Sequence, residues 1–238
     1  MTAVRYEAVF FDAIGTLFRL TPPHVIFSQV MTRVGHPISE VDAESLLRRA
    51  NNWWLDPGRQ LGRTAGEELA ERRHYVRLVL EDYGRPDDTE LSTHLVEEAY
   101  WARWVRPNVD SWPTLATLSG KARLALLSNG GPSVLDAVRH VGLASFFEQM
   151  SAGLEVGVQK PDPGAFLSAA ARLGVSPEHS LLVDDTPEHV AGAEAVGMRG
   201  VLLDREDAYA GWEGERIGNL ERLLRILGIY EETVEPIV

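Results

Sequence analysis

Short, largely apolar runs that end in acidic or small polar residues constrain the fold of this chain more than any other feature. Residues 8–11 lead into Asp12, residues 123–127 into Ser128, and residues 180–183 into a pair of acids. Such runs are typical of strands buried on both faces, as in a parallel sheet. Because parallel strands end at one edge, their polar ends gather where open α/β sheets bind ligands.

The first two strand ends are each followed by residues that turn the backbone. Gly15 and Thr16 follow Asp12 and break the first strand, although an Asp in this place can simply start a turn. After Ser128 comes Asn129-Gly130-Gly131-Pro132, and Pro132 suits the first position of a helix. The Ser128 hydroxyl, the Asn129 amide and the free N–H groups from Gly130 onward could hold an anion there, but an ordinary strand-to-helix loop has the same composition.

The other two stretches supply one cation and two more carboxylates. Lys160 is one of only two lysines in the chain and is followed by Pro161-Asp162-Pro163. A held ammonium can neutralise a bound oxyanion, although most lysines are simply solvated. Asp184 and Asp185 follow the strand at 180–183. Adjacent acids suit a hard divalent cation such as Mg²⁺, and they could equally cap the helix that starts at Thr186-Pro187.

In order and spacing, these four stretches resemble the four motifs of the haloacid dehalogenase (HAD) superfamily. That pattern is a strand ending in Asp-x-Asp-Gly-Thr, a strand ending in Ser or Thr, a lysine, and a strand ending in acids. The resemblance covers residues 5–20 and 107–204 and is weak across 21–105. Four motifs together are specific, whereas any one of them alone is not.

The resemblance implies a role for each matching residue. Asp12 matches the nucleophile, Ser128 matches the hydroxyl that contacts phosphate, and Lys160 matches the lysine that neutralises charge. Asp184 and Asp185 match the acids of the Mg²⁺ site, with Asp185 as the more direct ligand. The expected activity is that of a phosphatase acting on a small phosphorylated metabolite.

One position departs from the pattern of the family's phosphatases. They place a second Asp, the general acid and base, two residues after the nucleophile, where this chain has Ile14. Isoleucine cannot transfer a proton, and general acid catalysis contributes about 10²–10⁴ in rate. The family's metal uses the backbone carbonyl at this position, so the resemblance implies that Asp12, the Ile14 carbonyl and Asp185 still bind Mg²⁺. His24 is a candidate substitute acid, although a loop histidine is more often solvated.

Two alternatives stay open. The family's 2-haloacid dehalogenases need neither the acid nor a metal, and they resemble this chain at Asp12–Leu17 and Ser128–Pro132; however, they carry serines at the positions of Asp184 and Asp185. The other alternative is a non-catalytic, phosphate-binding regulatory protein. Phosphonate cleavage needs a cap lysine and none precedes residue 121, and phosphomutases need the missing acid.

The spacing of apolar residues predicts the domain organisation. Residues 21–106 have helical periodicity with breaks near residues 35, 57 and 85, and one of the expected helical runs extends from Leu91 to Val105. We expect a doubly wound, Rossmann-like α/β core (residues 1–20 and 107–238) with an all-helical cap inserted after the first strand. Aromatic residues of this segment, such as Trp54 and Tyr75, favour packing between its helices over a substrate pocket.

Composition excludes several classes of function. The net charge of −12 argues against nucleic acid and anionic membranes as partners, so an anionic substrate must be attracted by local charge. The chain has no cysteine, which rules out disulfides and thiol catalysis. No apolar segment is long enough to cross a membrane. We expect a cytoplasmic protein, either a monomer or a homodimer.

Overall fold

Six parallel strands form the central sheet of this computed structural model, which describes residues 6–56, 58 and 62–229. Their order is β5-β4-β1-β6-β7-β8, and all neighbouring strands pair in parallel. The strands are β1 (Ala8–Phe11), β4 (Arg123–Ser128), β5 (Gln149–Ala152), β6 (Ser180–Asp184), β7 (Arg199–Leu203) and β8 (Arg216–Ile217). The three strands predicted from the sequence are therefore the central neighbours β4, β1 and β6.

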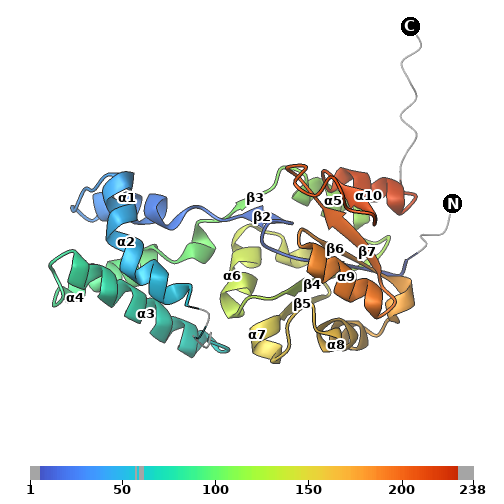
Figure 1. Cartoon of the computed structure of the whole chain (residues 1–238), viewed down its shortest axis with the longest axis horizontal. Helices are drawn as coiled ribbons and strands as arrows, with labels where there is room; N and C mark the ends of the chain where they lie inside the picture. The colour runs from blue at the N-terminus through green and yellow to red at the C-terminus, as the bar shows by residue number, and fades with distance from the viewer. Residues whose placement is uncertain (1–5, 57, 59–61, 230–238) are drawn as a thin grey trace, which may run out of the picture.

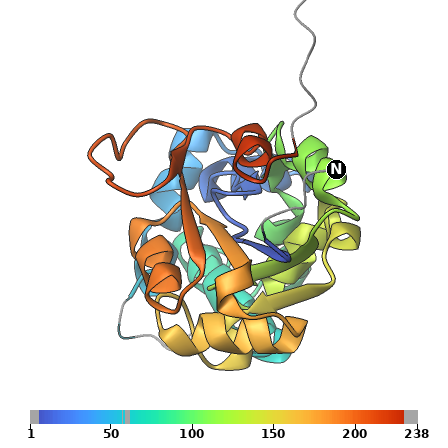
Figure 2. The ribbon, with the colours of Figure 1, turned by 90° about the vertical axis from the view of Figure 1, so that its right-hand side faces the viewer.

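Alternation along the strands gives the sheet two apolar faces. Val9 and Phe11 of β1 belong to a buried cluster with residues of α5, α6 and α10, whereas Ala8 and Phe10 pack with α8 and α9. Figure 2 shows helices around the strands on both sides. The predicted doubly wound α/β fold is confirmed. The core helices are α5 (Ser111–Leu118), α6 (Pro132–His140), α7 (Gly153–Val156), α8 (Pro163–Leu173), α9 (Pro187–Ala195) and α10 (Glu221–Ile226).

A second body, made of helices alone, lies beside the sheet (Figure 1). Its helices are α1 (Pro23–Arg33), α2 (Glu40–Trp54), α3 (Ala65–Asp82) and α4 (Thr89–Glu98). We call residues 20–105 the helical insert. It has its own apolar core, to which each helix contributes: Val30 from α1, Leu47 from α2, Val79 from α3 and Leu95 from α4 are all buried.

The two passages of the chain between the sheet and the helical insert lie side by side. β2 (Phe18–Arg19) pairs with β3 (Arg106–Pro107) in a two-stranded antiparallel ribbon. Asn108 ties the base of this ribbon to the loop after β1, since its main-chain N–H donates to the Leu17 carbonyl at 2.9 Å. Its side-chain amide donates to the Thr16 carbonyl at 3.0 Å. The ribbon and Asn108 thus tie the ends of the helical insert to the core.

The helical run expected from Leu91 to Val105 is wrong in its second half. Helix α4 ends at Glu98, and a short 3₁₀ turn (Trp101–Arg103) follows an extended Tyr100. The Trp104 indole N–H donates to the Glu98 carbonyl at 2.7 Å, which satisfies a main-chain acceptor at the end of α4. Among the described residues, no helix is long and apolar enough to span a membrane.

Candidate active site

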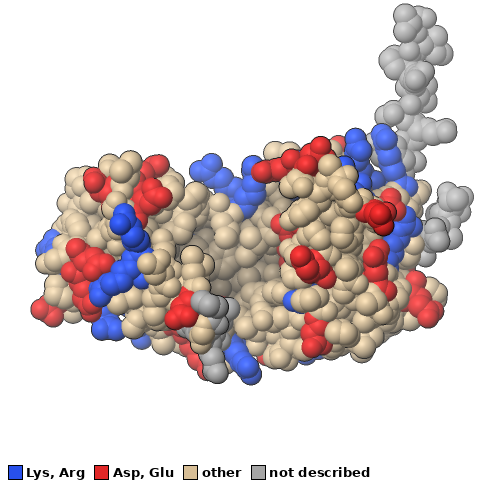
Figure 3. All heavy atoms as spheres, in the orientation of Figure 1, with Lys and Arg blue, Asp and Glu red and all other residues tan. Residues whose placement is uncertain are grey.

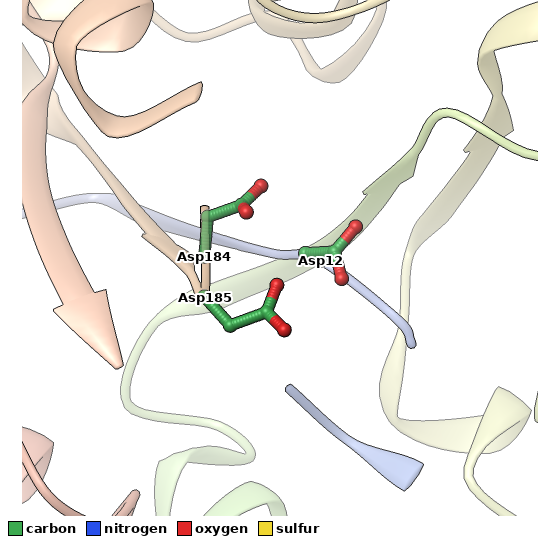
Figure 4. A group of neighbouring side chains, drawn as sticks. All are labelled: Asp12, Asp184 and Asp185. Carbon is green, nitrogen blue, oxygen red and sulfur yellow. The ribbon is translucent and has the colours of Figure 1, made fainter. Parts of the chain in front are cut away.

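The polar ends of the three central strands meet at one edge of the sheet. Phe11, the last residue of β1, pairs in register with Leu126 of β4 and Val183 of β6. The residues that follow these positions therefore emerge at the same edge. Asp12, Ser128 and Asp184 are buried there, and Asp185 is partly buried. Figure 4 shows the carboxylates of Asp12, Asp184 and Asp185 extending to the same side.

Lys160 joins this group across the chain. Its ammonium lies 2.8 Å from Asp12 Oδ1 and 2.5 Å from Asp184 Oδ2, and its side chain is fully buried. Burial lowers the pKa of this amine, but the Asp12 and Asp184 charges outweigh burial, so the pKa is raised and Lys160 is a cation. The structure thus brings together the four residues Asp12, Lys160, Asp184 and Asp185, which are far apart in the sequence.

The Asn129 side chain holds the main chain at Lys160. Its Oδ1 accepts from the Lys160 N–H and its Nδ2 donates to the Lys160 carbonyl, both at 2.7 Å. Gln159 also donates to the Asn129 carbonyl. In this structure the Asn129 amide therefore positions the lysine loop. Ser128, one residue earlier, is buried at the end of β4.

His189 is a residue of the site that the sequence interpretation did not include. It lies in the first turn of α9, and its Nδ1 is 3.1 Å from Asp184 Oδ1. Asp184 Oδ1 also accepts from the Thr186 N–H at 3.0 Å. Burial raises the pKa of Asp184, but Lys160 and His189 outweigh it and the pKa is lowered. The signal in the sequence that could have indicated this role is the position of His189, five residues after the strand-end acid Asp184.

The cluster holds more negative than positive charge. Burial raises the pKa of Asp12 to about 6. The Lys160 charge opposes this rise, but the charge of Asp184 partly cancels the effect of Lys160. Burial, followed by the charge of Asp184, also raises the pKa of Asp185. Three carboxylates share one ammonium, so a further cation would stabilise their ionised forms.

The donor set fits a hard divalent cation. Asp12, Asp184 and Asp185 each offer a carboxylate oxygen, and these atoms lie within 4.8 Å of one another. Lys160 occupies one oxygen of Asp12 and one of Asp184, which leaves Asp185 the carboxylate least used within the protein. Gly15 permits its approach: a Cβ at Gly15 would lie 1.9 Å from Asp185 Oδ2. Oxygen ligands of this kind are what Mg²⁺ prefers.

A cavity of about 610 Å³ lies between the core and the helical insert; among the described residues, those of the charged cluster do not line it. On the core side, Ile14 and Gly130 line the cavity, two residues after Asp12 and Ser128 respectively. On the side of the helical insert, Trp54, Tyr75 and Trp101 line it. The expected packing between helices holds for Tyr75 and Trp101, which pack against the core of the insert, but these two and Trp54 also line the cavity. Among the described residues, His24 is not one of those that line the cavity.

Glu68 closes one side of the cavity by linking the two bodies. It lies in α3, and its carboxylate accepts from the Ser133 main-chain N–H at 2.9 Å and the Ser133 hydroxyl at 2.8 Å. Ser133 is in the first turn of α6, where free N–H groups favour an anion. Gly131 allows the contact, since a Cβ there would lie 2.3 Å from Glu68 Oε1.

The chain belongs to the haloacid dehalogenase-like hydrolase family, whose model matches residues 6–197. It is therefore a hydrolase, and the resemblance seen in the sequence is confirmed. The match includes both the core strands that bear the acidic cluster and the helical insert.

Individual relatives differ in the reaction that their names state. The chain is 26% identical to a glyceraldehyde 3-phosphate phosphatase of Methanopyrus kandleri over 204 residues, which is 84% of each protein. It is 39% identical to a phosphoserine phosphatase of Thermus thermophilus over 101 residues, which span 42% of this chain and only 40% of that protein. Its structure resembles that of a 2-haloacid dehalogenase from Pseudomonas syringae, with a TM-score of 0.68, 25% identity and coverage of 94% and 98%.

Proposed function

We propose that the protein is a Mg²⁺-dependent phosphatase that acts on a small phosphorylated metabolite through an aspartyl-phosphate. The observation that carries this proposal is the buried Lys160 ammonium between Asp12 and Asp184, with Asp185 beside them. Four charged groups at one strand edge suit the transfer of a highly charged phosphoryl group. Phosphatases among the relatives support the same reaction.

Each residue has a task in this reaction. Asp12 attacks phosphorus, and the bond from phosphorus to the leaving oxygen breaks with its electron pair on that oxygen. Lys160, the Ser128 hydroxyl and the N–H groups of Asn129 and Gly130 bind the phosphoryl oxygens. Water then attacks the phosphorus of the aspartyl-phosphate, which regenerates Asp12 and releases inorganic phosphate.

Asp12, Asp185 and the Ile14 carbonyl would hold Mg²⁺, with Asp184 beside them. When bound, the ion would supply positive charge to the transferring phosphoryl group. The test is release of phosphate from acetyl phosphate and para-nitrophenyl phosphate, with Mg²⁺ and with EDTA. We expect turnover of both compounds that stops in EDTA and returns with Mg²⁺; turnover that is undiminished in EDTA would contradict the proposed metal.

Dehalogenation is the second candidate, because Ile14 supplies no proton donor and the dehalogenase fold is closely similar. In that reaction Asp12 would attack carbon and a halide would leave without a proton. The acids at 184 and 185 oppose it, since without a metal they would repel a carboxylate substrate. Chloride release from 2-chloropropionate that persists in EDTA would favour this candidate. A regulatory protein would instead bind phosphate compounds tightly and turn over none of them.

Replacing Ile14 with Asp is expected to restore general acid catalysis. We expect hydrolysis of esters with poor leaving groups, such as glycerol phosphate, to rise more than about tenfold. Hydrolysis of acetyl phosphate, which needs no proton donor, should change little. The measurement is kcat for both compounds in the two proteins. An equal change for both compounds would show that the introduced carboxyl group acts by another route.

We further propose that residues 21–106 act as a cap over the core formed by residues 1–20 and 107–238. The cavity between the two bodies supports this role, because Ile14, two residues after Asp12, lines it together with residues of the helical insert. The expected partner is a small anionic substrate. A cytoplasmic location and a monomeric or homodimeric state stay predictions from the sequence.

A further inference from the structure

We propose that the physiological substrate is the phosphate ester of a phenol-type hydroxyl, and that the ring of its leaving group occupies the cavity beside Ile14. This inference rests on the proposed phosphatase function and names the class of its substrate. It follows from three observations: the cavity wall is mostly apolar, several polar side chains in that wall bond to the protein itself, and Ile14, which carries no proton donor, lines the wall two residues after Asp12.

The cavity wall is built mainly from hydrocarbon. Leu20, Ile26, Phe27, Trp54 and Val134 are among the residues that line it, in addition to Ile14. In Figure 3 the visible recess between the two bodies is mostly tan, and the charged side chains lie largely on the outer surface. A volume of about 610 Å³ lies within the range of cavities that bind small organic molecules. Such a wall stabilises an apolar ring by removing it from water.

Several polar side chains in the wall already bond to the protein, although Arg72 Nε is buried there without a hydrogen-bond partner among the described residues. The Tyr75 hydroxyl donates to Asn51 Oδ1 at 2.5 Å, and Glu71 accepts from the Gly62 N–H at 2.9 Å. The Arg72 guanidinium lies 3.9 Å from the centre of the Tyr100 ring. A sugar or polyol needs free donors and acceptors for its hydroxyls, and side chains that already bond to the protein do not provide them. The wall also carries two negative charges, Glu68 and Glu71, against the single positive charge of Arg72, which disfavours a leaving group with a second negative charge.

The chemistry of the leaving oxygen points the same way. Ile14 lines the cavity and cannot donate a proton, so the oxygen must leave as an anion. A phenol has a pKa of about 10, whereas the pKa of an aliphatic alcohol, like that of water, is far higher. The phenoxide keeps the electron pair of the broken P–O bond and takes a proton from water only after it leaves. An aryl ester therefore meets both the shape and the chemistry of the site.

Four substrates separate these requirements in the intact protein with Mg²⁺. They are 1-naphthyl phosphate, cyclohexylmethyl phosphate (apolar, poor leaving group), glycerol phosphate (polar, poor leaving group) and acetyl phosphate (small, good leaving group). We expect kcat/KM for 1-naphthyl phosphate to exceed that of the cyclohexylmethyl and glycerol esters by at least about 100-fold. Cyclohexylmethyl phosphate should inhibit competitively, because it fits the cavity but does not react.

Two substitutions test the cavity itself. Leu20→Asp puts a charge on its wall, and Ala99→Phe fills part of its volume. Each should lower kcat/KM for 1-naphthyl phosphate about tenfold and leave acetyl phosphate within about twofold. Leu167→Asp is the matched control, because Leu167 on α8 is 47% exposed and Leu20 is 49% exposed. Calorimetry measures the affinity of 1-naphthyl phosphate for the Asp12→Asn variant, alone and combined with each change, and so tests the same contacts without turnover.

The outcomes distinguish this inference from the function on which it rests. If acetyl phosphate is hydrolysed but the glycerol or cyclohexylmethyl ester matches 1-naphthyl phosphate, the substrate class is wrong and the phosphatase stands. The same holds if Leu20→Asp and Ala99→Phe leave 1-naphthyl phosphate hydrolysis and binding unchanged. If no phosphate compound is hydrolysed, the proposed function fails and the inference fails with it.

Discussion

Replacing Asp12 with Asn is expected to lower kcat for acetyl phosphate by at least about 10³-fold, because the amide cannot form the aspartyl-phosphate. The change is nearly isosteric, so the core strand β1 and its neighbours should be undisturbed. Phosphate release at saturating substrate and Mg²⁺ measures the loss. Turnover within tenfold of the unchanged protein would show that Asp12 is not the nucleophile.

The same variant is expected to be more stable than the unchanged protein in EDTA at neutral pH. Burial raises the pKa of Asp12 from 3.8 to about 6, so its ionised form destabilises the metal-free fold by up to about 3 kcal/mol. This penalty is complete above about pH 6 and absent below about pH 4, where the carboxyl is protonated in both the folded and the unfolded states. Urea unfolding at several pH values should therefore show a gain that shrinks as the pH falls. A gain that is independent of pH would contradict this account.

Replacing Lys160 with Met is expected to destabilise the metal-free protein by about 3–5 kcal/mol and to abolish turnover. The methionine leaves Asp12 and Asp184 buried without their cation, and an uncompensated buried charge has this order of cost. Urea unfolding at pH 8 in EDTA measures the effect. Added Mg²⁺ should restore part of the lost stability, since the three carboxylates would then bind it.

Lys121→Met is the matched control for this experiment. Lys121 is the other lysine of the chain and is exposed in the turn before β4, so its loss should change the unfolding free energy by less than about 0.5 kcal/mol. If the two variants lose the same stability, Lys160 does not compensate the acidic cluster. A loss of stability at Lys160 that Mg²⁺ does not reduce would argue against a metal held by these acids.

The core of the fold could be predicted from the sequence because its signals are local. Each central strand is a run of apolar residues ended by a polar one, and Pro132, Pro163 and Pro187 each stand at the first position of a helix. The short edge strand β8, with two residues, has no such signal. The end of α4 was also missed, because a Trp104 side chain from beyond the helix decides it.

The site was predictable in part for the same reason. Asp12, Ser128, Lys160 and Asp184 follow motifs that can be read along the chain, and parallel strands bring their ends together. The link from Glu68 to Ser133 could not be foreseen, because it depends on how the helical insert lies against α6. The place of Trp54 and Tyr75 in the cavity wall was not foreseen for a similar reason: helical spacing predicts the helix that carries each residue, but not which neighbour its side chain faces.

The pairing of β2 with β3 makes the protein modular. Arg19 and Arg106 are neighbours across this ribbon, although 86 residues separate them in the sequence. A tight hairpin turn could therefore join them and leave every pairing of the six-stranded sheet in place. Under the proposed function, in which the helical insert selects the substrate, one core could thus serve chemically different esters by exchanging the segment between those two arginines.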